Sequence, residues 1–145
     1  MDRRHFFRRA AALACVPLGG SLLSACGGPS PAEVAVGEAR CAFCDRIISA
    51  RPFAAQILDG AGATRFFDDF GCAVHWIGQQ QVAEHTLTFW VMDYKGGYWI
   101  DAYTAVYSAG PQSPRGYNLV ASTIPGMGEL SYAEARDKAR AQGPA

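Results

Sequence analysis

The hydrophobic and polar residues of the first half of the chain predict a β-hairpin. Residues 53–58 and 64–67 are rich in hydrophobic side chains, and Asp-Gly-Ala-Gly-Ala lies between them at 59–63. Short apolar runs on either side of a glycine-containing turn are typical of two antiparallel strands. We therefore expect these residues to fold back on themselves as a hairpin.

A helix is predicted directly after the hairpin. Hydrophobic residues recur there at the spacing i, i+3, i+4 and i+7, which places them on one face of an α-helix. They are Phe70, Ala73, Val74 and Ile77. Asp69 stands at the N-cap position, where an aspartate can accept hydrogen bonds from the first turn. The pattern predicts a helix from Asp69 to about Gln80 with its apolar face buried.

The second half of the chain repeats this alternation of strand and helix signals. Residues 86–92 are hydrophobic and β-prone, and a glycine-containing turn at 93–97 connects them to a short run at 98–101. Residues 102–108 predict a second, shorter helix, and residues 117–121 predict a further strand. Ser131 and Glu134 have the spacing of a capping box, which predicts a terminal helix extending to about Gln142.

Two segments of the chain also resemble each other. Residues 66–74 align with residues 98–106, so that Asp69 matches Asp101, and each segment follows a glycine-containing turn. This similarity predicts an α+β fold of two small, similar ββα-type units, an internal pseudo-repeat, followed by a C-terminal helix. Chance agreement between two hairpin-plus-helix segments is the alternative. The predicted domain spans 36–145, with units at about 41–82 and 85–122 and the terminal helix at about 131–142.

Residues 1–25 have the composition of an export signal peptide. Arginines precede an apolar run at 10–23, and Leu23-Ser24-Ala25-Cys26 matches the bacterial lipobox, in which an apolar residue and two small residues precede a cysteine. In such lipoproteins the cysteine is acylated and becomes the N-terminus, so Cys26 is the predicted lipidation site. An ordinary signal peptide is the alternative, and the basic head fits either general or twin-arginine export.

The expected location is the cell envelope. Gly27, after the predicted lipidated cysteine, favours retention at the outer membrane with the folded part facing the periplasm. Residues 26–35 would then form the lipidated N-terminus and a tether.

Charge argues against a nucleic-acid partner. The 145 residues include 13 basic and 13 acidic side chains, so the formal net charge is zero. Removing the four arginines and one aspartate of residues 1–25 from these totals leaves nine basic and twelve acidic groups. A nucleic-acid-binding protein normally carries an excess of basic residues.

Three cysteines of the predicted mature chain are candidates for chemistry. Cys41 and Cys44 form a CxxC motif, which can bind one metal ion or close a small disulfide. Cys72 is expected in the first turn of the helix, and His75 follows three residues later on the same helical face. Because three thiols cannot all pair in an oxidising compartment, either one stays free or a metal binds them. Cys41, Cys44, Cys72 and His75 are therefore the candidate metal ligands.

No motif of a hydrolase nucleophile, a phosphate-binding loop or a zincin helix is found in the sequence. The candidate chemistry is therefore thiol chemistry, and the protein is predicted not to be an enzyme.

The order of these motifs resembles the NosL family, copper-binding lipoproteins associated with maturation of nitrous oxide reductase. Besides the lipobox and the CxxC motif, the resemblance rests on Phe-Asp-Asp-Phe-Gly-Cys at 67–72, Trp-Ile-Asp-Ala at 99–102 and Ser-Pro-Arg-Gly at 113–116. It spans about residues 41–121. It implies two small, similar α+β units, and Cu(I) binding without catalysis, since sulfur ligands suit Cu(I). The implied partner is an apo-cuproprotein, either nitrous oxide reductase or another one.

Two positions depart from the family pattern. The family usually has methionine two residues after the CxxC motif and after the proline of the later loop, where this sequence has Arg46 and Arg115. Arginine carries a permanent positive charge and cannot bind a metal ion. Any copper binding would therefore depend on the thiolates. The arginines could instead mark a relative that has lost the metal or binds an anion.

Three functions are compatible with the sequence. We favour a membrane-anchored periplasmic Cu(I)-binding accessory protein, or metallochaperone. A thiol–disulfide protein is the second, although the CxxC motif is followed by strand-like Ile47 and Ile48 rather than by a helix. A lipoprotein adaptor that binds no metal, with Cys41 and Cys44 in a structural role, is the third.

Overall fold

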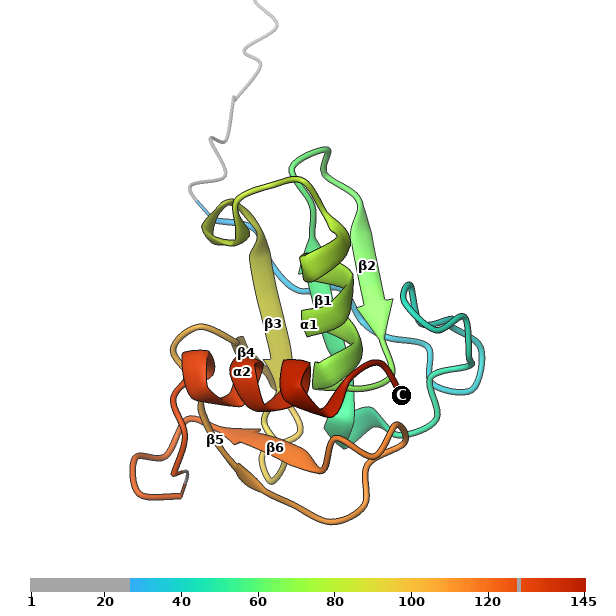
Figure 1. Cartoon of the computed structure of the whole chain (residues 1–145). Helices are drawn as coiled ribbons and strands as arrows, with labels where there is room; N and C mark the ends of the chain where they lie inside the picture. The colour runs from blue at the N-terminus through green and yellow to red at the C-terminus, as the bar shows by residue number, and fades with distance from the viewer. Residues whose placement is uncertain (1–26, 128) are drawn as a thin grey trace, which may run out of the picture.

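A computed structural model describes residues 27–127 and 129–145 of the chain (Figure 1). The predicted signal peptide and the predicted lipidation site Cys26 lie outside these residues. In the part that the structure describes, no helix is both long and apolar enough to cross a membrane.

A four-stranded antiparallel sheet forms the centre of the domain, with the strand order β2-β1-β3-β4. Its strands are β1 (Ala55–Leu58), β2 (Thr64–Phe67), β3 (Thr88–Met92) and β4 (Trp99–Asp101). The predicted hairpin is confirmed, because β1 pairs with β2 and Ala55 lies opposite Phe67. β3 pairs with the other edge of β1, where Ala55 lies opposite Val91. The predicted strand pair of the second half is also present, since β4 pairs with β3.

Helix α1 (Phe70–Gln79) covers one face of this sheet (Figure 1). All four residues of its predicted apolar face are buried, with at most 4% of each exposed. The Phe70 ring lies 4.8 Å from the Tyr107 ring and 6.0 Å from the Phe89 ring, between their centroids. The predicted helix and the orientation of its apolar face are therefore confirmed.

A second, two-stranded sheet occupies the place of the second predicted helix. Strand β5 (Val106–Ala109) pairs antiparallel with β6 (Leu119–Ser122). The prediction of a helix over 102–108 is wrong, and the second predicted ββα-type unit has a strand at this position. The α+β class and the C-terminal helix are confirmed.

The chain begins a helical turn after β4 and then extends. Asp101 Oδ1 accepts hydrogen bonds from the backbone N–H groups of Tyr103 and Thr104, as an N-cap would. Tyr107, which is 1% exposed, then pairs with Ala121 in β6. Aromatic and β-branched residues favour such a half-buried strand when a partner strand is at hand.

Helix α2 (Tyr132–Gln142) packs against α1 (Figure 1). Its predicted capping box is confirmed, because the Ser131 side chain accepts from the Glu134 backbone N–H and the Glu134 carboxylate accepts from the Ser131 backbone N–H. Ala135 and Ala139 are fully buried, and their small side chains allow the two helices to approach closely.

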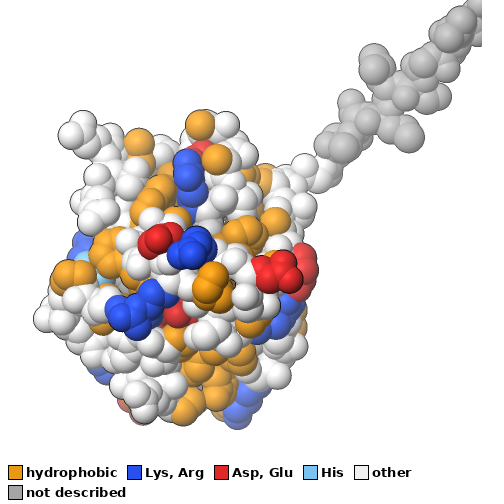
Figure 2. All heavy atoms as spheres, turned by 90° about the vertical axis from the view of Figure 1, so that its right-hand side faces the viewer, with side chains coloured by type: hydrophobic (Ala, Val, Ile, Leu, Met, Phe, Trp, Pro, Cys, Tyr) orange, Lys and Arg blue, Asp and Glu red, His pale blue; other side chains and the backbone are white. Residues whose placement is uncertain are grey.

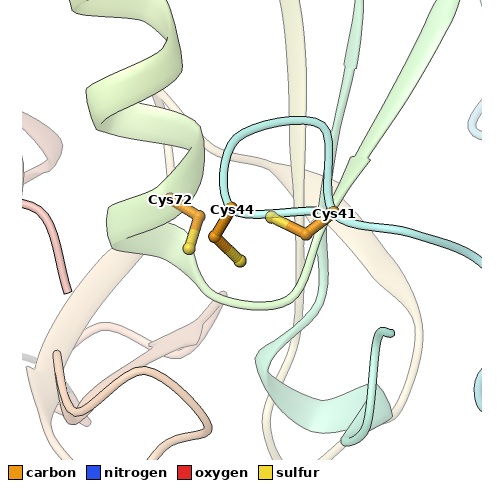
Figure 3. Close-up of side chains that lie close together, drawn as sticks. All are labelled: Cys41, Cys44 and Cys72. Carbon is orange, nitrogen blue, oxygen red and sulfur yellow. The ribbon is translucent and has the colours of Figure 1, made fainter. Parts of the chain in front are cut away.

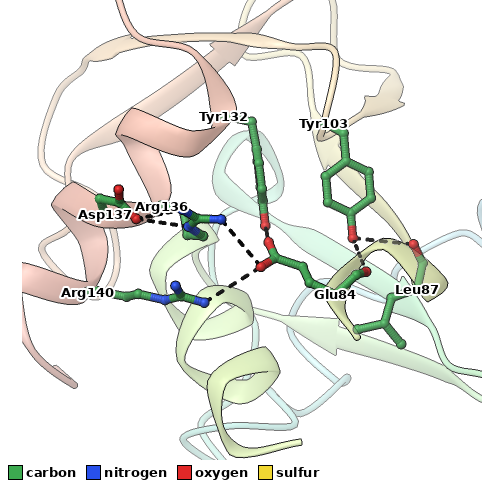
Figure 4. A network of polar contacts seen from close by, with 7 residues as sticks. All are labelled: Glu84, Leu87, Tyr103, Tyr132, Arg136, Asp137 and Arg140. Atoms are coloured by element: carbon green, nitrogen blue, oxygen red, sulfur yellow. Dashed lines mark hydrogen bonds and ion pairs between the residues drawn. The ribbon is translucent and has the colours of Figure 1, made fainter. Parts of the chain in front are cut away.

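A network of polar contacts around Glu84 also holds α2 in place (Figure 4). The Tyr132 hydroxyl donates to the Glu84 carboxylate, and the guanidinium groups of Arg136 and Arg140 approach the same carboxylate at 3.6 and 3.7 Å. The Tyr103 hydroxyl donates to the Glu84 backbone carbonyl at 2.8 Å. Glu84 begins the 3-10 helix η2 (Glu84–Thr86), so the network joins α2 to the segment that leads into β3.

The predicted tether over 26–35 is too long. The backbone N–H of Ala32 donates to Gln56 Oε1 at 2.9 Å, and Gln56 Nε2 donates back to the Ala32 carbonyl at 3.0 Å. Val34 is 4% exposed and packs with Ile48 and Ala54 in a second hydrophobic cluster. A hydrophobic residue and a paired backbone fix this segment to the sheet, so the folded domain begins before residue 36. A 3-10 helix, η1 (Arg51–Phe53), connects this cluster to β1.

Candidate metal centre

A tight turn carries the first two cysteines. The Asp45 backbone N–H donates to the Cys41 carbonyl at 2.9 Å, and the Cys41 N–H donates to the Arg46 carbonyl at 2.8 Å. Asp45 closes the turn with a φ of 59°, in the left-handed region that is unusual for a residue with a Cβ. The Ala42 N–H donates to the Phe66 carbonyl at 2.8 Å, which attaches the turn to β2.

Cys72 joins these two cysteines from the first turn of α1. The β2–α1 connection brings this turn beside the CxxC motif, and the three side chains converge (Figure 3). The three sulfur atoms all lie within 4.8 Å of one another, and none of these three cysteines is in a disulfide. Three sulfurs placed around one ion at about 2.3 Å each would be about 4 Å apart, so a small shift would let all three bind one metal.

The three sulfurs differ in their access to solvent. Cys72 is 0% exposed and Cys41 is 2% exposed, whereas Cys44 is only partly buried. A metal ion bound by all three would therefore be enclosed on the Cys41 and Cys72 side and approachable on the Cys44 side.

Hydrogen bonds give the three thiols different affinities for a proton. The Cys72 thiol donates to the Cys41 sulfur and, with backbone N–H groups that include those of Cys44 and Asp68, lowers the pKa of Cys41 to about 5 against the effect of burial. The same bond, together with burial, raises the pKa of Cys72 far above its usual range. Burial raises the pKa of Cys44 as well. At neutral pH the cluster therefore holds one thiolate, Cys41, and two thiols.

Two buried aspartates fix the segments around the cluster. Asp68 Oδ1 accepts from the Ser49 backbone N–H at 2.8 Å. Asp69 Oδ2 accepts from the Ser113 hydroxyl at 2.5 Å and from the Arg115 backbone N–H at 3.2 Å. Asp69 does occupy the N-cap position of α1, but its side chain accepts no hydrogen bond from the first turn. The predicted capping hydrogen bond of the Asp69 side chain is therefore wrong, and this side chain makes long-range contacts instead. Burial raises the pKa of Asp69.

His75 is directed toward α2 rather than grouped with the thiols. Its Nε2 lies 3.2 Å from the Ala139 carbonyl oxygen. Its ring stacks on Phe43 at 5.7 Å between centroids and lies 5.8 Å from the Tyr117 ring. The group of close ligand atoms contains the three cysteines and not His75. The structure thus gives His75 a role in packing the CxxC turn against the helices.

The two arginines at the family's methionine positions lie on segments next to the cluster. Arg46 is exposed and follows the CxxC turn, and Arg115 is partly buried in the loop that Asp69 holds. None of the acidic groups in the described part of the chain lies within ion-pair distance of either guanidinium. The neighbouring Arg40 does form an ion pair, with Asp45 at 3.4 Å. Figure 2 shows basic and acidic side chains interspersed on this side of the molecule, which carries the CxxC turn.

Phe43 and Asp68 contribute to the site but were not singled out from the sequence as site residues. Phe43 lies between the two cysteines and stacks on His75, and the backbone N–H of Asp68 is one of the groups that lower the pKa of Cys41. The position of Phe43 inside the CxxC motif already indicates that it lies beside the two cysteines. The contact from Asp68 depends on the tertiary fold, and no local pattern indicates it.

Comparisons with protein-family models, with curated proteins and with solved structures find no match to this chain. The likeness to the NosL family therefore remains a resemblance of motifs. The function has to be argued from the thiol cluster itself.

Proposed function

We propose that this protein is a membrane-anchored accessory protein that binds Cu(I) and delivers it to a periplasmic apo-cuproprotein, with nitrous oxide reductase as one possible recipient. The observation that carries the proposal is the group of three cysteine sulfurs within 4.8 Å of one another. The copper ion would be cargo that is bound and passed on, and no bond of an organic substrate would be made or broken.

The chemistry of the donor set favours Cu(I) over other ions. Thiolates are soft ligands that select Cu(I), zinc or iron–sulfur clusters over harder ions. Structural zinc sites are almost always closed by four protein ligands. Because His75 Nε2 lies against the Ala139 carbonyl, the cluster offers three ligands, which suits the low coordination number of Cu(I) better.

The membrane anchor in this proposal rests on the sequence. The lipobox ending at Cys26 would place the domain at the cell envelope, facing the periplasm and, with Gly27 following, at the outer membrane. The folded part begins to contact the sheet at Ala32, so only a few residues would separate it from the lipid.

The low pKa of Cys41 supports a second candidate function, thiol–disulfide exchange. A CxxC thiolate at neutral pH is the usual nucleophile of such proteins. However, the Cys41 sulfur belongs to a residue that is only 2% exposed, and an attacking thiolate needs access to its substrate. We therefore rank this function below copper delivery. A lipoprotein adaptor that binds no metal is the remaining alternative.

Competition for Cu(I) with a chromophoric chelator, under anaerobic conditions, tests the proposal. We expect one Cu(I) per chain, and at least a tenfold loss of affinity, about 1.4 kcal/mol, when Cys41, Cys44 or Cys72 is replaced by serine. Cys26→Ser is the matched control, since it removes a cysteine outside the cluster and should leave the affinity unchanged while releasing the protein from the membrane fraction.

Three results would contradict the proposal. Failure of the parent to bind Cu(I) would leave the adaptor as the function. A reversible Cys41–Cys44 disulfide formed without copper would favour thiol–disulfide exchange. Full Cu(I) affinity in all three cluster variants would place the metal elsewhere.

A further inference from the structure

The three cysteines of the cluster differ in how far they are enclosed. Cys41 is 2% exposed, and its backbone is held within the CxxC turn, because its N–H donates to the Arg46 carbonyl at 2.8 Å and its carbonyl accepts from the Asp45 N–H at 2.9 Å. Cys72 is 0% exposed, and its backbone N–H donates to the Asp69 carbonyl at 3.1 Å in the first turn of α1.

Cys44 is the most exposed of the three. It is only partly buried, whereas Cys41 and Cys72 are buried. Asp45 and Arg46, which directly follow Cys44, are exposed, and so is Ala42 within the turn. An incoming ligand can therefore reach Cys44 over the surface of the turn, whereas Cys41 and Cys72 lie behind it.

Resting on the proposed function, we infer that Cys44 is the exchange ligand of the copper site. Cu(I) would enter and leave through the Cys44 side, while Cys41 and Cys72 keep hold of the ion until the transfer is under way. The partner is a molecule that presents a soft sulfur ligand, such as a cysteine thiol, to this exposed turn.

The exchange step is a ligand substitution without electron transfer. The incoming thiol sulfur donates an electron pair to Cu(I) as the bond between Cu(I) and the Cys44 sulfur breaks. The Cys44 sulfur keeps the electron pair of the broken bond and takes the proton that the incoming thiol gives up. Copper remains Cu(I), and one copper–sulfur bond replaces another. Low coordination numbers of soft metal sites allow such a hand-over.

Alkylation of the copper-loaded protein tests this inference. The full chain in detergent is loaded with one Cu(I), treated anaerobically with limiting iodoacetamide, and examined by native mass spectrometry and peptide mapping. We expect a species that carries one alkyl group and still retains one copper ion, with the alkyl group on Cys44 at least ten times more often than on Cys41 or Cys72. Alkylation of Cys41 or Cys72 in the copper-retaining species would overturn the inference, and so would alkylation of Cys44 confined to copper-free chains.

Serine variants provide the second measurement. Cys44→Ser should keep a larger share of the Cu(I) affinity than Cys41→Ser or Cys72→Ser, and should release Cu(I) to excess bicinchoninate faster than the parent. Equal losses for all three folded variants would refute the unequal roles. A parent that takes up no Cu(I) would refute the proposed function and this inference with it, whereas a parent that binds Cu(I) but is alkylated first at a buried cysteine refutes the inference alone.

Discussion

Replacing Gly71 by alanine should destabilise the protein although alanine is the better helix former. Gly71 lies in the first turn of α1, directly before Cys72. A Cβ added at this position would lie 2.3 Å from both Cγ and Cδ1 of the Tyr117 ring, far inside van der Waals contact. The ring has little room to withdraw, because Tyr117 is 1% exposed and its hydroxyl donates to the Gly143 carbonyl at 3.1 Å.

The two opposing effects can be compared in magnitude. Overpacking a buried site typically costs about 1–3 kcal/mol, and so short a contact belongs at the upper end of that range. The higher helix propensity of alanine returns at most about 1 kcal/mol. We therefore expect Gly71→Ala to lower the free energy of unfolding by about 2 kcal/mol, which at about 4 °C per kcal/mol corresponds to a fall in Tm of about 8 °C.

Thermal unfolding followed by circular dichroism measures this effect, and Gly78→Ala is the matched control. Gly78 lies in the same helix, but a Cβ there would meet no atom within 4 Å, so only the gain in helix propensity applies. The control should raise the stability by up to about 1 kcal/mol. If Gly71→Ala is as stable as the parent, or if both variants shift Tm in the same direction, the packing of Tyr117 on α1 described here is wrong.

Three further predictions concern the core, the turn and the thiols. Val74→Asp places an unpaired charge at a position that is 1% exposed and should lower the free energy of unfolding by several kcal/mol in urea titrations; a loss below about 1 kcal/mol would refute the burial of this helix face. Asp45→Gly should raise the free energy of unfolding, measured in the same way, by up to about 1 kcal/mol, because glycine adopts a φ of 59° without strain. A lower free energy of unfolding than that of the parent would contradict this prediction. Cu(I) uptake at pH 7 should release about two protons, since Cys41, with a pKa of about 5, is already a thiolate while Cys44 and Cys72 are protonated. Release of three protons in a pH-stat titration would show that Cys41 is a thiol.

The pKa of Cys41 gives the direction in which this residue's own contribution to stability changes with pH. Folding lowers this pKa to about 5 from the ordinary thiol value of about 8.5. Between these two pH values the unfolded chain holds a proton that the folded chain has released, so the Cys41 contribution to stability increases with pH. The contribution is lost as pH falls through about 5. The difference in free energy of unfolding between the parent and Cys41→Ser, measured across this pH range, gives the contribution of Cys41. If the two proteins show the same pH dependence, Cys41 is not a thiolate in the folded state.

The elements predicted correctly are those whose signals are local. The β1–β2 hairpin and α1 depend on turn residues and on the apolar spacing of neighbouring residues, and the capping box at Ser131 lies within four residues of the chain. The helix predicted for 102–108 failed because the signal for its start, at Asp101, is local, whereas the extended conformation of the following residues depends on β6. This strand lies beyond a nine-residue loop and pairs Ala121 with Tyr107. A partner strand at that distance leaves no trace in the periodicity of 102–108 itself.

The candidate site shows the same division between local and long-range information. The helical spacing of Cys72 and His75 predicted that both side chains share a face. However, α2 lies beside His75, and the Ala139 carbonyl oxygen of α2 lies 3.2 Å from His75 Nε2. The residue that interacts with His75 is 64 positions away in the sequence. The three cysteines could be grouped from their number and their order, whereas their spacing and unequal burial follow from how the CxxC turn is attached to β2.

The aspartates beside Cys72 connect the sulfur cluster to the rest of the fold. The Asp68 carboxylate accepts from the Ser49 backbone N–H, in the segment after the CxxC turn. Asp69 holds the hydroxyl of Ser113 at 2.5 Å, in the loop that follows β5. Three segments distant in the sequence are thereby fixed around the first turn of α1. Because a buried carboxylate that loses a partner is costly, removing the Ser113 hydroxyl would disturb the first turn of α1, which carries Cys72, as well as the stability of the domain.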